Sequence, residues 1–339
     1  MIDPKILSAL HNFDTELVGR SLARSNLTGF NLSGAHLAGS DLSSADLSQA
    51  DLTEADLSGA NLSGADLYRS KLCGAIMVGA DLKNADLTLA DLRGVNLSGA
   101  NLSGAKLSGV DLSDSNLSGA TLECIDLYEA NLCRANLSGT VMHRANLSFA
   151  RLEGAKLFAA NLQGARLAGC EARGACLIGA NLTNAKLDGA YLIKADLSWA
   201  NFTGASLTDV NLEESNLSQA ELVQVEMMDV DLSGAMMPRV RLLGSDLSGT
   251  CLVEADLWSS VIEKTSYAGA DLSGTNLART GISREKALTE YPDIKHSPNT
   301  RWDDLQDMIR VVLLNSDPPL PPGRFAATRR PGLYDRLRR

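Results

Sequence analysis

A large apolar residue recurs at every fifth position along most of this chain. The interval from Leu17 to Leu277 holds 53 such positions, (277 − 17)/5 + 1, and 45 of them are Leu. The eight exceptions are uncharged residues: Met77, Met142, Ala172, Phe202, Met227, Met237, Ile262 and Tyr267. No insertion or deletion breaks the phase, so the repeat dominates the sequence.

A spacing of five fits neither common secondary structure. On an α-helix, a step of five residues rotates the side chain by about 140°, so the leucines would spiral around the helix. On a flat strand, side chains alternate between two faces, and an odd step sends successive leucines to opposite sides. If the chain turns a corner after every five residues, each Leu can face one common core. The pattern therefore predicts a solenoid.

The residues around each repeated Leu support this shape. In the stretch ADLSGANLSGADL, residues 55–67, Ala lies two positions before each Leu, Asp or Asn lies one before, and Ser-Gly follows. One large and one small inward residue per side can fill a narrow tube without voids. Asp and Asn suit corners, because their side chains hydrogen-bond nearby backbone groups. We expect the other three positions of each repeat to face solvent.

The glycines indicate how many repeats make one coil. A spacing of 20 gives an unbroken run of seven: Gly19, Gly39, Gly59, Gly79, Gly99, Gly119 and Gly139. A spacing of 15 from the same start gives Gly at seven of nine positions. The glycines thus favour four sides per coil over three without deciding between them. Four sides predict about 13 coils, stacked roughly 4.8 Å apart.

The commonest form of the repeat, A(D/N)LSG, resembles the pentapeptide-repeat family over residues 15–282. This resemblance implies an all-β fold, namely a right-handed quadrilateral β-helix. In that fold each pentapeptide forms one side of a square, and four pentapeptides form a coil.

Both ends of such a rod would expose apolar surface and unpaired edges, so we expect caps. Residues 1–14 combine Asp3-Pro4 with apolar residues at helical spacing, which predicts an N-terminal helical cap. Residues 283–317 are predicted to form a C-terminal helical cap. One face of its helix would cover the last coil or form a homodimer interface through Trp302, Leu305, Ile309 and Val312. Residues 318–339, rich in Pro and Arg, are predicted to be disordered.

Composition narrows the classes of function. The chain has 31 Lys and Arg against 41 Asp and Glu, so its formal net charge is −10. This balance argues against direct nucleic-acid binding, because phosphate affinity depends on basic residues. No apolar run approaches the roughly 20 residues of a membrane span. The six cysteines form no CxxC pair, and the N-terminus lacks a signal-peptide pattern, so we expect a cytoplasmic location.

The sequence offers no catalytic, cofactor or metal site. Its four histidines are far apart, and no two have metal-ligand spacing. No GxxxxGK[ST], HExxH or GxSxG motif occurs. A tube packed with Leu and Ala also leaves no interior pocket. We therefore expect no enzymatic activity, no cofactor and no metal.

Four-sided coils allow charge to be counted by side. Sides 1, 2, 3 and 4 contain Leu17, Leu22, Leu27 and Leu32, respectively, and each side continues at every twentieth residue. Side 3 has ten acidic and four basic residues, and side 4 has twelve and six, so both have a net charge of −6. Sides 1 and 2 have net charges of −1 and +1. The negative charge is expected on two adjacent sides.

A negative rod about as wide as a duplex resembles the DNA-mimicking members of the pentapeptide-repeat family. The resemblance implies a regulator of type II topoisomerase that binds DNA gyrase and protects it from quinolones. Basic residues such as Lys71 and Lys106 interrupt the acidic sides, and the loop insertions of some such members are absent. The candidate mimic residues are Asp46, Asp51, Asp66, Asp86, Asp91, Asp111, Asp126, Glu213, Asp229 and Asp231.

Side 1 predicts a different function. It is nearly uncharged, and Phe158, Trp199 and Trp258 occupy outward positions in its second half. Large aromatic residues on an exposed, weakly charged strip are typical of protein interaction surfaces. Scattered surface aromatics are the alternative, and side 3 also carries Tyr128 and Phe149.

The main hypothesis is a non-enzymatic protein-binding scaffold whose partner the sequence does not name. A DNA-gyrase regulator is the first alternative. Family resemblance implies a further one, a secreted bacterial effector that acts in a host cell.

Overall fold

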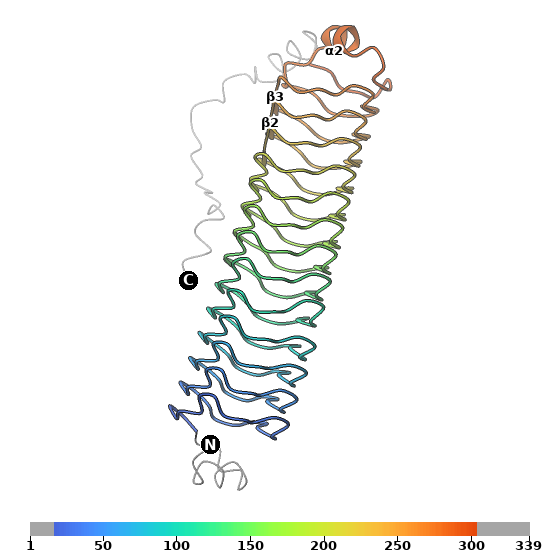
Figure 1. Cartoon of the computed structure of the whole chain (residues 1–339). Helices are drawn as coiled ribbons and strands as arrows, with labels where there is room; N and C mark the ends of the chain where they lie inside the picture. Colours follow the sequence, from blue (N-terminus) through green and yellow to red (C-terminus); the bar gives the residue numbers. More distant parts are fainter. Residues whose placement is uncertain (1–16, 304–339) are drawn as a thin grey trace, which may run out of the picture. The chain divides into compact units, whose positions relative to one another are not determined.

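The computed structural model describes residues 17–303, and residues 1–16 and 304–339 lie outside the described part. In the described part, the chain winds into a stack of similar coils, from the N-terminal coils in blue to the C-terminal ones in orange (Figure 1). Turns recur at intervals of five residues along the stack. The predicted N-terminal helical cap, residues 1–14, and the predicted tail, residues 318–339, lie outside the described residues.

Backbone pairing sets the size of one coil. Parallel β-bridges join residues twenty apart, for example Asp56 to Ile76. Beside this bridge, the Leu57 N–H donates to the Ile76 carbonyl at 2.7 Å, and the Gly59 N–H donates to the Val78 carbonyl at 2.8 Å. The chain therefore returns to the same side after four pentapeptides, as the glycine spacing of 20 favoured. The right-handed winding and the count of about 13 coils stay predictions.

Each corner is a four-residue turn. The Leu57 carbonyl accepts the Ala60 N–H at 3.0 Å. Gly59, the third residue of this turn, has φ 63°, a conformation that glycine adopts without strain. Between residues 19 and 279, every residue with positive φ occupies this same position, two after the repeated apolar residue. Trp199, with φ 62°, is therefore held in a conformation that costs a bulky residue free energy.

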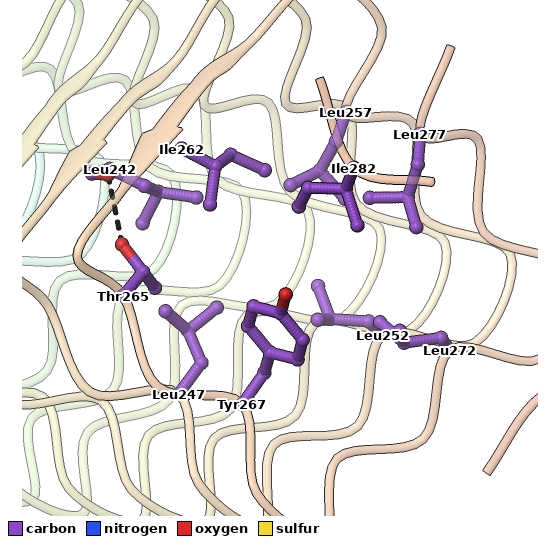
Figure 2. A pocket seen from close by; sticks show the side chains of 10 residues that line it. All are labelled: Leu242, Leu247, Leu252, Leu257, Ile262, Thr265, Tyr267, Leu272, Leu277 and Ile282. Carbon is purple, nitrogen blue, oxygen red and sulfur yellow. Dashed lines mark hydrogen bonds between the residues drawn. The ribbon is translucent and has the colours of Figure 1, made fainter. Parts of the chain in front are cut away.

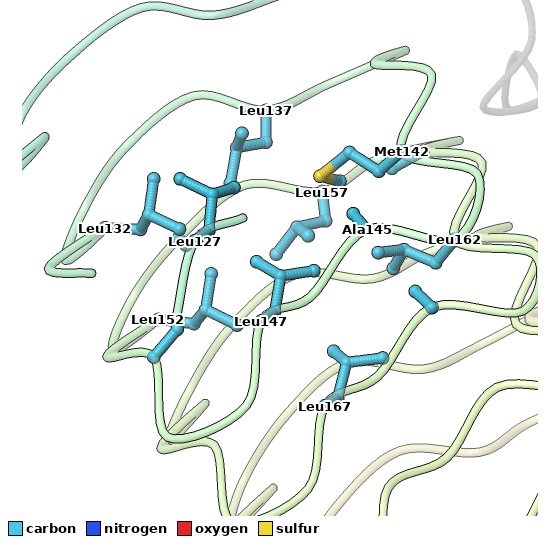
Figure 3. Close-up of a cluster of buried hydrophobic side chains, with 14 of the residues drawn as sticks. Leu127, Leu132, Leu137, Met142, Ala145, Leu147, Leu152, Leu157, Leu162 and Leu167 are labelled. Atoms are coloured by element: carbon cyan, nitrogen blue, oxygen red, sulfur yellow. The ribbon is translucent and has the colours of Figure 1, made fainter. Parts of the chain in front are cut away.

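The repeated Leu and the Ala two residues before it build the core. Leu57 and Ala60 are both fully buried, and they belong to one continuous apolar cluster along the stack. Figure 3 shows how Leu127, Leu147 and Leu167 point into the interior from successive coils of one side. Burying each Leu is worth about 1.5–3 kcal/mol before the loss of chain entropy.

Three successive segments of side 2 are long enough to form strands. They are β1 (Glu221–Val223), β2 (Arg241–Leu243) and β3 (Val261–Glu263). They pair in parallel in the order β1-β2-β3, again with partners twenty residues apart. Elsewhere in the stack, including the earlier coils of side 2, the described pentapeptides bridge to the next coil through single residues.

A short helix follows the last regular repeat. Helix α2 (Arg284–Glu290) begins after Ser283, whose hydroxyl accepts the Lys286 N–H at 3.2 Å. Its Ala287 is fully buried. Figure 1 shows α2 at the C-terminal end of the stack.

The chain then pairs with the stack again. Lys295 bridges to Asp271 and Arg301 bridges to Asn276, at spacings of 24 and 25 residues instead of 20. These residues belong to the predicted helical cap, and their pairing was not predicted, because the chain passes through α2 and the regular repeat is interrupted there. The helical C-terminal cap as a whole stays a prediction.

Trp302, a residue of the predicted cap, is 6% exposed. Its ring lies edge-on to the His296 ring, with centroids 5.9 Å apart. Leu305, Ile309 and Val312 lie outside the described residues. A homodimer through this segment therefore stays a prediction.

Candidate functional site

The carboxylates that precede the repeated Leu are part of the corners. Oδ1 of Asp56 accepts the Ser58 N–H at 3.0 Å and the Ser58 hydroxyl at 2.6 Å. These hydrogen bonds from Ser58 lower the pKa of Asp56 below its ordinary value of 3.8. Asn61 accepts the Ser63 N–H in the same way at 3.1 Å. The structural role expected for Asp and Asn at this position is confirmed.

The predicted mimic residues occupy the two acidic sides. Side 3 holds Asp46, Asp66, Asp86, Asp126 and Asp229, and side 4 holds Asp51, Asp91, Asp111, Glu213 and Asp231. Within residues 17–303 there are seven ion pairs, and five of them lie on side 4. Lys71, for example, lies 3.2 Å from Asp51, twenty residues earlier. Basic side chains thus neutralise part of the surface that a DNA mimic would use.

The acidic surface is continuous only near the C-terminal end. Between residues 205 and 274, sides 3 and 4 carry nine acidic residues and no basic one: Asp209, Glu213, Glu214, Glu226, Asp229, Asp231, Asp246, Glu254 and Asp271. Of these nine, Glu214 alone forms an ion pair within the described residues, with Lys194 at 3.0 Å. This region, rather than the full length of the stack, has an uncompensated negative charge.

Side 1 carries the predicted aromatic residues. Phe158 is 47% exposed and Trp199 is 60% exposed, and Met236 on the same side is also exposed. We call Phe158, Trp199 and Trp258 the aromatic strip. The bridges of side 1 run continuously from Lys156 through Cys176, in steps of twenty residues, to Asp256, so the strip lies on one paired face.

Trp258 differs from the other two aromatic residues. It is only partly exposed, because the guanidinium groups of Arg239 and Arg279 each lie 5.4 Å from its ring centroid. Such cation–π contacts hold a Trp ring in one orientation. The aromatic strip therefore ends in a positively charged, preorganised cluster.

A second pair of aromatic residues lies on side 3. The rings of Tyr128 and Phe149 pack edge-on, with centroids 5.8 Å apart. Phe149 is 55% exposed, and its ring lies over Gly169 of the next coil, where an added Cβ would come within 2.6 Å of the ring. The absence of a side chain at Gly169 gives Phe149 room to lie along the surface.

The interior cavity found within residues 17–303 is smaller than a substrate molecule. This apolar cavity has a volume of about 20 Å³. Figure 2 shows the side chains that line it, which are leucines together with Ile262, Tyr267, Thr265 and Ile282. The Thr265 hydroxyl is occupied, because it donates to the Leu242 carbonyl at 2.9 Å. A larger groove of about 340 Å³ lies between this region and α2, lined by Lys264, Lys286 and Tyr291 among others.

Other reactive groups are dispersed or buried. Cys170 is fully buried, and burial raises the pKa of its thiol to about 12, so it is unreactive. Among residues 17–303, no group of three His, Cys, Asp or Glu is arranged to hold a metal ion. None of the helices described is long and apolar enough to cross a membrane.

Stacked pentapeptide coils with a filled core define a repeat protein that displays its functional groups on its outer sides. The family profile for pentapeptide repeats matches in eight copies between residues 21 and 257. The chain belongs to the pentapeptide-repeat family.

Solved structures of this family are similar to the chain. HetL, a pentapeptide repeat protein involved in heterocyst differentiation regulation in the cyanobacterium Nostoc sp., shares 35% identity, with a TM-score of 0.52. That match covers 63% of this chain and 96% of HetL. Rfr23 from the cyanobacterium Cyanothece shares 25% identity over 39% of this chain and 91% of its own, with a TM-score of 0.26.

QnrB1, a plasmid-mediated fluoroquinolone resistance protein, shares 16% identity over 75% of this chain and 96% of its own, with a TM-score of 0.27. A comparison with curated protein sequences finds no match.

The five-residue period alone did not predict the partners of the charged and aromatic side chains. Lys71 and Asp51 are twenty residues apart, and so is nearly every ion pair of side 4. Given a coil of twenty residues, opposite charges at this spacing would have predicted these ion pairs. Arg239 lies 19 residues before Trp258 and Arg279 lies 21 residues after it, so these cation–π contacts also join adjacent coils.

Proposed function

We propose that this protein is a non-enzymatic scaffold that binds a protein partner through side 1. The observation that carries the proposal is the aromatic strip, in which Trp199 is 60% exposed on a weakly charged face. Exposing Phe158 and Trp199 on one face of a protein with few aromatic residues costs solvation free energy. A partner that covers the aromatic strip would remove these side chains from water and so regain that free energy.

The chemistry of the strip indicates the kind of partner. Trp and Arg are the residues that most often dominate binding energy in protein interfaces. Here Trp199 would anchor the centre, and Arg239 and Arg279 would pair with acidic groups of the partner near Trp258. We therefore expect a protein surface with an apolar groove and an acidic rim.

Rigidity of the stack supports binding. Phe158 and Trp258 are five coils apart, or roughly 24 Å at the usual strand spacing. Every coil between them is tied to the next by backbone hydrogen bonds. A partner would thus meet anchors whose positions are already set, which lowers the entropic cost of association. The likeness to HetL, a protein involved in regulating differentiation, is in keeping with a role through binding.

The test is a comparative pull-down from the native cell with mass spectrometry. Trp199→Ala and Trp258→Ala should each lose a protein that the unmodified chain retains, with unchanged circular dichroism. The matched control is Tyr191→Ala, which removes another exposed aromatic residue, from side 4, and should retain the partner. Equal retention by all variants would rule out the aromatic strip as the binding surface.

A DNA-mimicking regulator of gyrase is the second candidate function. The observation that favours it is the acidic surface between residues 205 and 274 of sides 3 and 4. Under this hypothesis, purified protein inhibits supercoiling by DNA gyrase, and added salt weakens the inhibition. Replacing Asp229 and Asp231 by Asn should weaken it further, whereas no inhibition at micromolar protein would exclude this function.

A further inference from the structure

Charge on the second half of side 3 is separated into blocks. Arg166 and Lys186 are exposed basic residues, and Asp209, Glu226 and Asp229 are exposed acidic residues one to three coils further on. None of these five forms an ion pair within residues 17–303. Side 4, by contrast, pairs most of its basic residues with acidic ones.

Neighbouring coils place like charges side by side in these blocks. Arg166 bridges to Lys186, and Glu226 bridges to Asp246, so each cation lies beside a cation and each anion beside an anion. Directly adjacent like charges on a sheet are destabilising. A binding partner with acidic groups facing the basic pair and basic groups facing the acidic pair would offset both repulsions.

We propose that the partner on side 3 is a second copy of this chain, packed face to face and antiparallel. The two-fold axis would run across the face, between the coil of Leu187 and the coil of Leu207. Each coil of one copy then meets one coil of the other, with Leu167 level with Met227 and Leu147 level with Leu247. A two-fold interface of this kind is self-complementary, so every contact occurs twice.

This register matches charge. It places Arg166 opposite Glu226 of the second copy, at the same position of the pentapeptide. Asn146 falls opposite Asp246 of the second copy, where its amide can donate a hydrogen bond to the carboxylate. Asp188, which accepts a hydrogen bond from the Ser206 hydroxyl, lies opposite Thr208 of the second copy.

The same register brings exposed apolar side chains together. Met228, which is 39% exposed, falls opposite Ala168 of the second copy. The ring of Phe149 lies over Gly169 of its own chain, so it falls beside Met228 of the second copy. Tyr128 falls opposite Ala268. The two faces would therefore share apolar contacts as well as charged ones.

Each neighbouring register sets two equal charges against each other on its two-fold axis. A shift by one coil in one direction puts the axis on the Leu207 coil and sets Asp209 against Asp209 of the second copy. That register also pairs Lys186 with Glu226, but it sets Met228 against Asp188 instead of Ala168. The opposite shift puts the axis on the Leu187 coil and sets Lys186 against Lys186. The proposed register avoids both like-charge contacts, and the apolar contact of Met228 distinguishes it from the register centred on the Leu207 coil.

The interface would be small. Eight coils, from that of Leu127 to that of Tyr267, span roughly 40 Å, and a side about 10 Å wide gives about 800 Å² over both copies. This area is at the low end for specific interfaces, so the dimer should dissociate at low concentration. Side 1 lies two sides away in the coil, so the dimer would leave two aromatic strips free.

Sedimentation velocity of the full chain at low salt tests this proposal. The unmodified protein should form a concentration-dependent dimer that high salt weakens. Arg166→Glu and Glu226→Arg should each raise the dissociation constant on the order of tenfold or more, because two like-charge contacts form per dimer. The double variant Arg166→Glu with Glu226→Arg should restore dimerisation.

The controls separate this interface from other contacts. Lys156→Glu reverses a charge at the same pentapeptide position on side 1 and should leave the dimer unchanged. A monomer at all concentrations would overturn the proposal. A dimer whose dissociation constant is unchanged by Arg166→Glu would also overturn it. So would a double variant, Arg166→Glu with Glu226→Arg, that has the melting temperature of the unmodified protein but does not dimerise. Rescue by Arg166→Glu with Asp246→Arg instead would overturn the register.

Discussion

At the residue scale, the hydrogen bond that Asp or Asn accepts from the backbone N–H two residues on is the most regular interaction outside the core. It occurs at Asp56, Asn61 and many equivalent positions, on all four sides. Each such bond satisfies a backbone N–H in a turn that has no other partner for it. The preference for Asp and Asn is therefore a requirement of the fold rather than of a binding site.

We predict that Asp56→Ala destabilises the protein by about 1 kcal/mol, because the Ser58 N–H loses its acceptor. Asp56→Asn keeps a side-chain oxygen at the same place and should cost less. Thermal melting of both variants checks this prediction. Equal melting temperatures for Asp56→Ala and the unmodified protein would contradict it.

The sequence predicted well which residues face inward and which lie at corners, because local geometry determines both. The inward position of Leu57 and the corner position of Asp56 depend only on the five-residue period. The cation–π contacts of Arg239 and Arg279 with Trp258 could not be predicted from the five-residue period alone. These residues lie in adjacent coils, so predicting the contacts requires the length of a coil. Long-range side-chain contacts were visible only after the twenty-residue pairing was established.

At the scale of one coil, stability comes from leucines stacked in a filled interior. Leu147 is fully buried in the region of Figure 3, with Met142 in the adjacent pentapeptide. Neighbouring coils support each other, so a void in one coil weakens both of its neighbours.

Leu147→Ala should therefore lower stability by about 2–5 kcal/mol, because the rigid tube cannot collapse around the void. Leu147→Met should cost less than about 1.5 kcal/mol, since Met fills an equivalent position at Met142. Denaturant unfolding followed by circular dichroism gives both values. A similar loss for the two variants would contradict the tightly packed tube.

The C-terminal end was the least predictable element. Helix α2 lies within residues 283–317, the segment that the sequence predicted to form a helical cap. The pairing of Lys295 and Arg301 with the last coil was not foreseen, because its spacing differs from the regular period. The five-residue repeat cannot predict the structure of residues beyond its end. There, tertiary contacts determine the course of the chain.

For the molecule as a whole, the five-residue period allows the surface to be rearranged while the core stays the same. Inserting one pentapeptide keeps every Leu inward, but it moves all later residues to the next side. Inserting four pentapeptides restores the original sides after one extra coil, since pairing partners are twenty residues apart.

This separation predicts the effect of an insertion after Gly179, between Phe158 and Trp199. One extra ANLSG unit should leave the melting temperature nearly unchanged yet weaken partner binding at least tenfold, because Phe158 no longer shares a side with the other two aromatics. Four units should weaken binding less, because the strip is only lengthened. Pull-down and thermal melting of the two insertions check this prediction, and equal binding by both would contradict it.

The central claim is that side 1 binds the partner, and hydroxyl-radical footprinting of the captured complex tests it most directly. Trp199 and Tyr191 are similarly exposed, at 60% and 53%, on different sides. On binding, oxidation of Phe158 and Trp199 should fall severalfold, while that of Tyr191 should stay unchanged. Protection of Tyr191 with no change at Trp199 would contradict the claim.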